Sequence, residues 1–237
     1  MPKPSPSSAT AQPDSDAQFR HTPGAAEPGP PDKGASRQGP GVSASGWTDP
    51  GASATLKGEA GAGGADPRHP HLFHLAGAPA DLFDGGGLQG AHGDNWPLLQ
   101  GQQGAIYLAR LAPGGVREPH WHPSAWEINF VIQGRVRWSF VGPNSTHDSF
   151  EAAKGDVVFA PQGHLHYFEN ASDTDDLIVL IVFNSSAKEP DDDIGIVQSL
   201  KAMPPDVLAA VFGASPETFA TLPGKFGRVV IASKARK

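Results

Sequence analysis

The segment Pro113-Gly-Gly-Val-Arg-Glu-Pro-His-Trp-His-Pro-Ser-Ala-Trp-Glu127 places a tryptophan between two histidines, His120 and His122. Successive side chains of a β-strand point to opposite faces, so residues two apart share one face. An extended backbone here therefore sets two imidazole rings side by side. Glu127 follows across a short turn, at the start of the apolar stretch Glu127–Ile132. The segment predicts two neighbouring strands that bring three potential metal ligands together.

A second block, Gly155-Asp-Val-Val-Phe-Ala-Pro-Gln-Gly-His-Leu-His166, supplies a fourth candidate. Pro161-Gln-Gly163 is a tight-turn sequence, and it returns the chain so that His166 can face the first three side chains. A single buried histidine or glutamate is commonly satisfied by hydrogen bonds, but a carboxylate among imidazoles in an apolar interior needs a charged partner or a metal. We predict one divalent metal ion on four residues: His120, His122, Glu127 and His166.

The ligand set consists of nitrogen and oxygen without sulfur, because the chain contains no cysteine. Such ligands suit manganese, iron, nickel, copper or zinc, and they do not choose between these metals. Four ligands on an octahedral ion leave two positions open. That arrangement is typical of a catalytic site rather than of a closed structural one.

Short β-like segments surround both blocks at regular spacing, and turn sequences such as Gln133-Gly134 and Lys154-Gly155 separate them. The expected strands are Ala105–Leu111, Val116–His122, Glu127–Ile132, Val136–Val141, Ser149–Ala152, Val157–Ala160, His166–Glu169 and Leu177–Phe183. Many short strands without interleaved helices indicate a sandwich or a closed barrel. Leu177–Phe183 is apolar at every position, which predicts burial on both faces. The Gly-rich stretch Asp84–Asp94 is expected to be a link that precedes these strands.

The two blocks match both signature motifs of the cupin superfamily at their fixed positions: Gly114, His120, His122, Glu127, Gly134, Gly155, Pro161, Gly163, His166 and Asn170. By this resemblance, residues 104–183 are identified as the core of a member of that superfamily. The resemblance implies an all-β fold, a single small jelly-roll β-barrel. Asn170 is expected to be a turn residue or a support for the ligands rather than a ligand itself.

The regions that flank the barrel core differ in composition. Residues 1–69 contain five large apolar side chains among many Gly, Ala, Pro and Ser, too few to offset the entropy of ordering the chain. We expect a disordered low-complexity tail over residues 1–69 and a cupin domain over residues 70–237. Near the end, Pro204–Gly213 and Ser215–Leu222 predict short C-terminal helices within residues 199–223, each with proline near its start. These helices are expected to pack outside the barrel or against a neighbour.

Both blocks closely resemble the metal-binding strands of oxalate decarboxylases, and the resemblance continues into Pro204–Gly213 and Leu222-Pro-Gly224. It implies manganese as the metal and Arg117 as a substrate-binding residue. Opposite charges about 4 Å apart attract by about 4 kcal/mol at an effective dielectric near 20, so a metal beside Arg117 suits the dianion oxalate. Ideal strand alternation sends Arg117 to the face opposite His120. The role therefore requires a local bulge, aided by Pro119.

The sequence departs from that family in two ways. The resembled decarboxylases carry two cupin domains, whereas this sequence shows one. Their proton donor is an acid on a lid loop after the last core strand, or a glutamate within that strand, where this chain has Ile181. The lid position falls in Asn184–Asp193, which does not match the family's lid. Glu189 and Asp191 flank Pro190 there and are the candidate catalytic acids, although a run of acids in a loop is also typical of solvated surface.

Three functions remain open from the sequence. The leading hypothesis is a lyase that resembles oxalate decarboxylase and acts on oxalate or a similar small carboxylate. The alternatives are a non-catalytic cupin that binds a metal and a small acid, and an oxidase or dioxygenase that uses the same metal site. Formate release, saturable binding without turnover, and peroxide release separate these three possibilities.

Composition also limits the partners. The net charge is −7 with no basic cluster, which argues against nucleic acid or an anionic membrane as a partner. No apolar run approaches the roughly 20 residues that span a bilayer, and the N-terminus lacks the apolar stretch of a secretory signal. A cytoplasmic location is expected. A single cupin domain that resembles half of a two-domain protein is also expected to form a homodimer.

Overall fold

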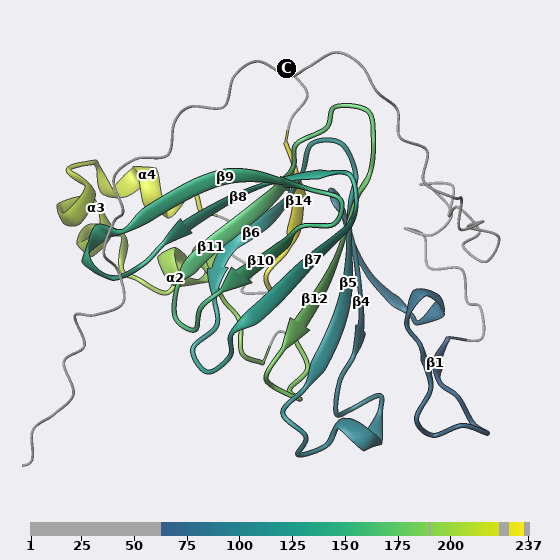
Figure 1. Cartoon of the computed structure of the whole chain (residues 1–237). Coiled ribbons are helices and arrows are strands. Elements are labelled where there is room, and N and C mark those ends of the chain that lie inside the picture. The colour runs from purple at the N-terminus through teal and green to yellow at the C-terminus, as the bar shows by residue number, and fades with distance from the viewer. Residues whose placement is uncertain (1–62, 190, 223–227, 235–237) are drawn as a thin grey trace, which may run out of the picture. The chain divides into compact units, whose positions relative to one another are not determined.

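The computed structural model describes residues 63–189, 191–222 and 228–234 of the 237-residue chain. Two antiparallel sheets form the barrel (Figure 1). In spatial order the first holds β10 (Val157–Ala160), β7 (Glu127–Gln133), β12 (Leu177–Phe183), β5 (Ala105–Leu111), β4 (Gly86–Ala91) and β3 (Ala80–Phe83). The second holds β13 (Ile194–Gly195), β6 (Gly115–Trp121), β11 (Leu165–Asn170), β8 (Arg135–Val141) and β9 (His147–Ala153), and β14 (Ile231–Ser233) also pairs with β6.

The hydrophobic core draws on both sheets. In β8, every second side chain is buried, which is the alternation expected of a strand with one face toward a core. Trp138 of β8 stacks on Phe140 and packs at a tilt against Phe168, and all three are buried. Leu177 and Val179 of β12 complete the opposite wall. The all-β barrel predicted from the strand pattern is confirmed.

The predicted strands are all present, and three of them have the predicted bounds: Ala105–Leu111, Val157–Ala160 and Leu177–Phe183. The prediction for Asp84–Asp94 was wrong, because β4 runs through it and is almost wholly buried between β3 and β5. Its glycines serve close approach rather than flexibility. A Cβ on Gly86 would lie 2.0 Å from the backbone oxygen of Arg110. The small residues that we interpreted as a linker are therefore required for close packing of β4 against its neighbours.

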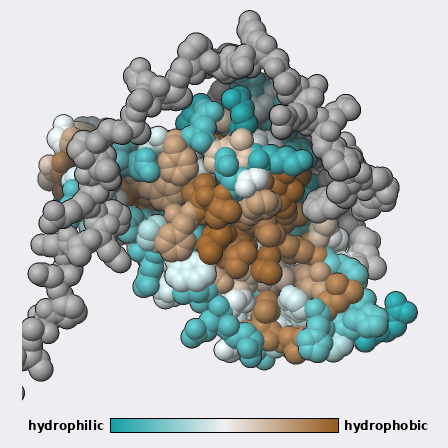
Figure 2. All heavy atoms as spheres, viewed as in Figure 1, coloured by the Kyte–Doolittle hydropathy of each residue, from teal (hydrophilic) through white to brown (hydrophobic). Residues whose placement is uncertain are grey.

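The outer side of the first sheet is apolar and open. Leu180 and Val182 of β12 are half-buried, so on the outer face the expected burial holds for Ile178 but not for these two residues. Beside them, Val157 pairs with Phe130 and Phe159 pairs with Ile128 across β10 and β7, and these four side chains are 36–62% exposed. We call these four residues the outer apolar face. Figure 2 shows hydrophobic side chains gathered over the strands that Figure 1 labels β7, β10 and β12.

A bulge in β6 turns Arg117 inward. β6 pairs with β11 through His120 opposite His166 and through Arg117 opposite Phe168, so the two strands fall out of step by one residue between these pairs. The extra residue lets Arg117 and His120 share the interior side despite their odd spacing. Arg117 is 1% exposed. The bulge that the sequence required is therefore confirmed.

The C-terminal segment forms three short helices: α2 (Ile196–Lys201), α3 (Pro205–Phe212) and α4 (Pro216–Ala220). The two predicted helices are confirmed as α3 and α4, which pack against each other through Phe212 and Phe219. Gly213 ends α3 in a left-handed conformation with φ of 65°. Ser215 occupies the N-cap position of α4, but its side chain makes no capping hydrogen bond. In the described part of the chain, no helix is long and apolar enough to cross a membrane.

The structure describes the last seven residues of the predicted tail, 63–69. β1 (Gly64–Ala65) pairs with β2 (Phe73–His74), and Asp66 accepts backbone hydrogen bonds from Arg68 and His69. Residues 63–69 therefore have defined structure, whereas residues 1–62 of the predicted tail lie outside the described residues. Among the described residues, 3₁₀ turns also lie at Leu75–Gly77, Pro97–Leu99 and Pro143–Ser145.

Gly195 allows β13 to lie against the ligand-bearing strand β6. It pairs with His120, and an added Cβ would lie 2.7 Å from Glu118 Oε1. That carboxylate is held by the backbone N–H groups of Val197 at 2.9 Å and Val230 at 3.1 Å. It therefore has little freedom to move aside.

We expect Gly195→Ala to lower the free energy of unfolding by about 1–3 kcal/mol, the usual cost of overpacking a tight contact. Gly104→Ala is the matched control, because a Cβ at Gly104 meets nothing within 4 Å. Denaturant unfolding of both variants measures the difference. Equal stability would contradict the close contact between β13 and β6.

Candidate functional site

The four predicted ligands meet inside the barrel. His120 lies on β6, His122 directly after it, Glu127 at the start of β7 and His166 on β11, and each is 3% exposed or less. One potential ligand atom from each lies within 4.8 Å of the others. His122 Nε2 is 3.4 Å from Glu127 Oε2, and His166 Nε2 is 3.2 Å from Glu127 Oε1. The geometry therefore brings together all the residues that the sequence singled out as ligands.

The turn at Pro161–Gly163 aligns the second block with the first. Gly163 adopts φ of 75°, and its N–H donates to the backbone oxygen of His122 at 3.0 Å. This hydrogen bond fixes the turn to the end of the ligand strand. His166 then pairs directly opposite His120 in the β11–β6 ladder.

Each imidazole is anchored through Nδ1. In His120, Nδ1 lies 2.6 Å from the backbone oxygen of Glu118, and in His166 it lies 2.9 Å from that of His164. In His122, Nδ1 lies 2.9 Å from Asp193 Oδ1. Because these oxygens accept, Nδ1 carries the proton, and Nε2 is left as the nitrogen that can bind a metal.

The free nitrogens support metal binding. His122 Nε2 and His166 Nε2 are buried and make no hydrogen bond within the described part of the chain. Buried polar atoms are rarely left without a partner, and a metal ion satisfies such nitrogens. Three imidazole nitrogens and one carboxylate form a nitrogen and oxygen donor set for a divalent ion. The residues present therefore fit the predicted metal.

Electrostatics favours the protonation states that ligation needs at two positions. Burial, together with the neighbouring charges of His166 and Arg117, holds the pKa of His120 well below its usual value. Burial raises the pKa of Glu127, but His166 and His122 outweigh it and hold that pKa well below its usual value. For His122, burial lowers the pKa, but Asp193 and Glu127 outweigh burial and raise it to about 10. A metal that binds Nε2 of His122 must displace a proton there.

Arg117 lies beside this site, and its guanidinium is already hydrogen-bonded to other residues of the chain. Its Nη1 donates to the backbone oxygen of Val229 at 2.7 Å, and its Nη2 donates to Asp193 Oδ2 at 3.1 Å and to the carboxylate of Glu189. Glu189 is itself buried, and its backbone N–H donates to the hydroxyl of Tyr107 at 2.7 Å. Arg117, the predicted substrate-binding residue, is therefore in direct contact with Glu189, one of the two predicted catalytic acids.

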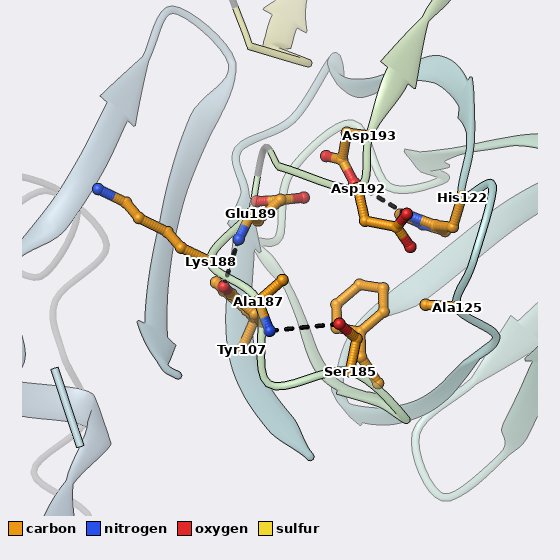
Figure 3. A pocket seen from close by; sticks show the side chains of 10 residues that line it. Tyr107, His122, Ala125, Ser185, Ala187, Lys188, Glu189, Asp192 and Asp193 are labelled. Atoms are coloured by element: carbon orange, nitrogen blue, oxygen red, sulfur yellow. Dashed lines mark hydrogen bonds and ion pairs between the residues drawn. The ribbon is translucent and has the colours of Figure 1, made fainter. Parts of the chain in front are cut away.

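A small pocket adjoins this cluster, and His122, Glu189 and Asp193 are part of its lining (Figure 3). It is lined by Tyr107, His122, Ala125, Phe183, Ser185, Ala187, Lys188, Glu189, Asp192 and Asp193. Asp191 is exposed and does not line the pocket. Asp192 accepts a hydrogen bond from the Ser124 hydroxyl at 2.7 Å. The structure thus separates the two candidate acids, and the catalytic roles of Glu189, Asp191 and Arg117 stay predictions.

Comparison with known proteins gives the family. A family model described as Cupin matches residues 76–219, which is more than half of the chain. This chain belongs to the cupin family. The signature positions in the sequence and the jelly-roll barrel agree with that assignment. Asn170 has the turn role expected of it in this cupin, because its side chain bonds the backbone of Leu111, Ser172 and Asp175.

The relatives of this cupin include enzymes and germin-like proteins. It is 32% identical over 149 residues to a probable oxalate decarboxylase of Arthroderma benhamiae, over 62% of this chain and 36% of that protein. It is also 32% identical over 154 residues to germin-like protein subfamily 2 member 3 of Arabidopsis thaliana, over 64% of this chain and 69% of that protein.

Among solved structures, the cupin is similar to the oxalate decarboxylase of Bacillus subtilis, a protein with Mn(II) centres. The TM-score is 0.60 at 25% identity, over 68% of this chain and 41% of that one. The cupin therefore spans less than half the length of the oxalate decarboxylases that it matches. The expected resemblance to oxalate decarboxylase is confirmed.

Sequence reasoning did not single out two residues of this cupin's site. Asn129 Nδ2 donates to Glu127 Oε1 at 2.9 Å and is completely buried. Its position two residues after Glu127, on the same strand face, was an available signal. Asp193 lies in a run of acids in which no pattern distinguished it, because its contacts depend on how β13 pairs with β6.

We predict about one divalent ion per chain, and we expect His120→Ala or His166→Ala to lose nearly all of it, because each removes an inner ligand. His164→Ala is the matched control, because the side chain of His164 lies outside the cluster while its backbone oxygen remains to anchor His166. Elemental analysis of the purified proteins measures the number of metal ions per chain. Full occupancy in either ligand variant would refute the assignment.

Proposed function

We propose that this cupin is a metal-dependent enzyme that acts on oxalate or a similar small carboxylate, with manganese as its metal. The observation that carries the proposal is the buried guanidinium of Arg117 next to four residues that fit a divalent ion. Buried cations beside an open metal position favour a small anion with two charged ends. The similarity to oxalate decarboxylases supports the same substrate class.

Substrate binding must reorganise the pocket. Arg117 is paired with Glu189 and Asp193, so an incoming carboxylate has to compete with at least one of them. Glu189 comes from the loop that lines the pocket, and we expect it to be the one displaced. A planar guanidinium can then bind the substrate carboxylate through two parallel hydrogen bonds.

Glu189 is the proton donor in this proposal. Bringing a dianion next to its carboxylate favours the protonated form, because like charges oppose ionisation. A bound divalent ion would stabilise negative charge on the substrate oxygens. When the carbon–carbon bond breaks and carbon dioxide leaves, the remaining carbon takes the proton from Glu189, and formate is the product. The resulting carboxylate recovers its proton from solvent.

The runner-up is a cupin that binds a metal and a small acid without turnover. It is favoured by the germin-like relatives and by Ile181, a buried apolar residue at the strand position where an acid was sought. An oxidase or dioxygenase with the same ligands is the third possibility. A location in the cytoplasm and the absence of nucleic-acid or membrane partners stay predictions from composition.

We expect manganese-loaded wild-type protein to release formate from oxalate, and Glu189→Gln to lower that rate by about 100-fold, the usual contribution of a positioned acid. Arg117→Lys should weaken substrate capture, because lysine lacks the planar fork. Asp191→Asn compares the second candidate acid. Formate and peroxide are measured for all four proteins. Peroxide without formate, or saturable oxalate binding with neither product, would replace the decarboxylase proposal with an alternative.

We also propose that the cupin forms a homodimer through the outer apolar face. Exposed apolar patches on this scale are uncommon in monomers and mark interaction sites. The first 62 residues offer little to cover it, because their large apolar side chains are only Met1, Phe19, Val42, Trp47 and Leu56. A flat face built from neighbouring antiparallel strands can meet a second copy of itself about a two-fold axis.

Light scattering on the full chain tests this dimer. We expect wild type to be dimeric and Val157→Lys to be monomeric, because the substitution places a charge at the most exposed residue of the outer apolar face. Val211→Lys is the control, since Val211 is an equally apolar residue on α3 that is 76% exposed. A monomeric wild type would rule out the proposal, as would a Val157→Lys variant that remains dimeric.

A further inference from the structure

Asp193 joins the candidate metal site to Arg117, and it belongs to neither of the two cupin sequence blocks. Its side chain is 3% exposed. One carboxylate oxygen, Oδ1, lies 2.9 Å from His122 Nδ1, and the other, Oδ2, lies 3.1 Å from Arg117 Nη2. A single carboxylate therefore contacts both the ring of a candidate ligand and the cation that the proposed substrate would use.

Backbone pairing determines this placement. β13 is antiparallel to β6, with Ile194 opposite Trp121 and Gly195 opposite His120. Extending this register by one residue puts Asp193 beside His122. Because Gly195 has no Cβ, β13 can take this position beside the buried carboxylate of Glu118. The position of Asp193 therefore follows from the ligand strand itself.

The anchor of His122 differs in kind from those of the other two imidazoles. His120 and His166 donate to backbone oxygens, which every residue type supplies. His122 donates to a charged carboxylate, which forms a stronger hydrogen bond and makes the opposite ring nitrogen a better electron donor. The basicity and orientation of one ligand thus depend on the identity of one side chain.

We propose that Asp193 is a positioning residue that orients His122 toward the metal and at the same time restrains Arg117. The inference rests on the proposed function, because it takes the four-residue cluster to be a metal site. It goes beyond that function by linking metal affinity and anion affinity through one carboxylate. Loss of its charge has opposite effects on the two, since the metal ligand loses its anchor while Arg117 loses a competing anion.

The metal arm of the test uses Asp193→Asn, which keeps the shape of the side chain and removes its charge. Competition with a chelating indicator measures Mn²⁺ affinity in the full chain. We expect a loss of about 10- to 100-fold, the usual effect of removing a residue that orients a metal ligand. Asp192→Asn is the matched control, with the same charge change at the adjacent residue, whose carboxylate contacts Ser124 instead of the cluster. Its Mn²⁺ affinity should equal that of wild type.

The anion arm separates positioning from general loosening. Oxalate binding to metal-free protein is measured by calorimetry for wild type and Asp193→Asn, and thermal unfolding confirms that both are folded. We expect oxalate affinity in the variant to be unchanged or higher while Mn²⁺ affinity falls. A parallel loss of both affinities would overturn the inference, because it would show a merely structural role. Equal Mn²⁺ affinity in wild type and variant would also overturn it.

The outcomes distinguish this inference from the proposed function. If wild type binds no Mn²⁺ or other divalent ion, the metal site fails and the inference fails with it. If wild type binds Mn²⁺ normally and Asp193→Asn does as well, only the inference fails. Neither measurement depends on turnover, so a cupin without decarboxylase activity still gives a decisive result.

Discussion

The site depends on one constraint, which is that a carboxylate and three imidazoles are buried together in an apolar barrel. Each of these groups loses its hydration, so each needs a partner inside the protein. Glu127 has the imidazoles and Asn129, and each ring has an oxygen at Nδ1. Within the described part of the chain, Nε2 of His122 and Nε2 of His166 have no hydrogen bond, and both lie on the Glu127 side of their rings. A metal ion at this point would satisfy both nitrogens.

The same constraint extends to Arg117. A buried guanidinium without partners would be as costly as a buried carboxylate, and the chain surrounds it with Glu189, Asp193 and a backbone oxygen. A bound divalent ion and Arg117 would together balance the carboxylates of Glu127, Glu189 and Asp193, so the metal-loaded site would be close to neutral before an anion enters. A bound anion gains little from net attraction and must instead form better hydrogen bonds than the carboxylates it replaces. Selectivity then comes from geometry more than from charge.

Features of the fold and site that depend on residues close together in sequence were predictable, and features that depend on contacts between distant residues were not. Strand alternation and the spacing of His120, His122, Glu127 and His166 are local patterns, so the barrel strands and the ligand set were predictable. The bulge at Arg117 was predictable, because ideal strand alternation would place Arg117 on the face opposite His120 while its implied role in substrate binding requires the same side. Asp193 was not predictable, since its role is set by the pairing of β13 with a strand far away in sequence. The burial of β4 was missed because glycines that permit close packing look like glycines of a linker.

The ligand strand β6 is completed by residues that are synthesised long after it. Arg117 and Glu118 bond to the backbone of Val229 and Val230, each 112 residues downstream, and Ile231 of β14 is fully buried against the same strand. Contacts over such a distance require the closure of a long loop, so they form more slowly than local contacts. During biosynthesis, all four ligands leave the ribosome well before the strand that stabilises their edge. The edge of the strand that carries His120 is therefore completed only after residues 229–231 have been synthesised.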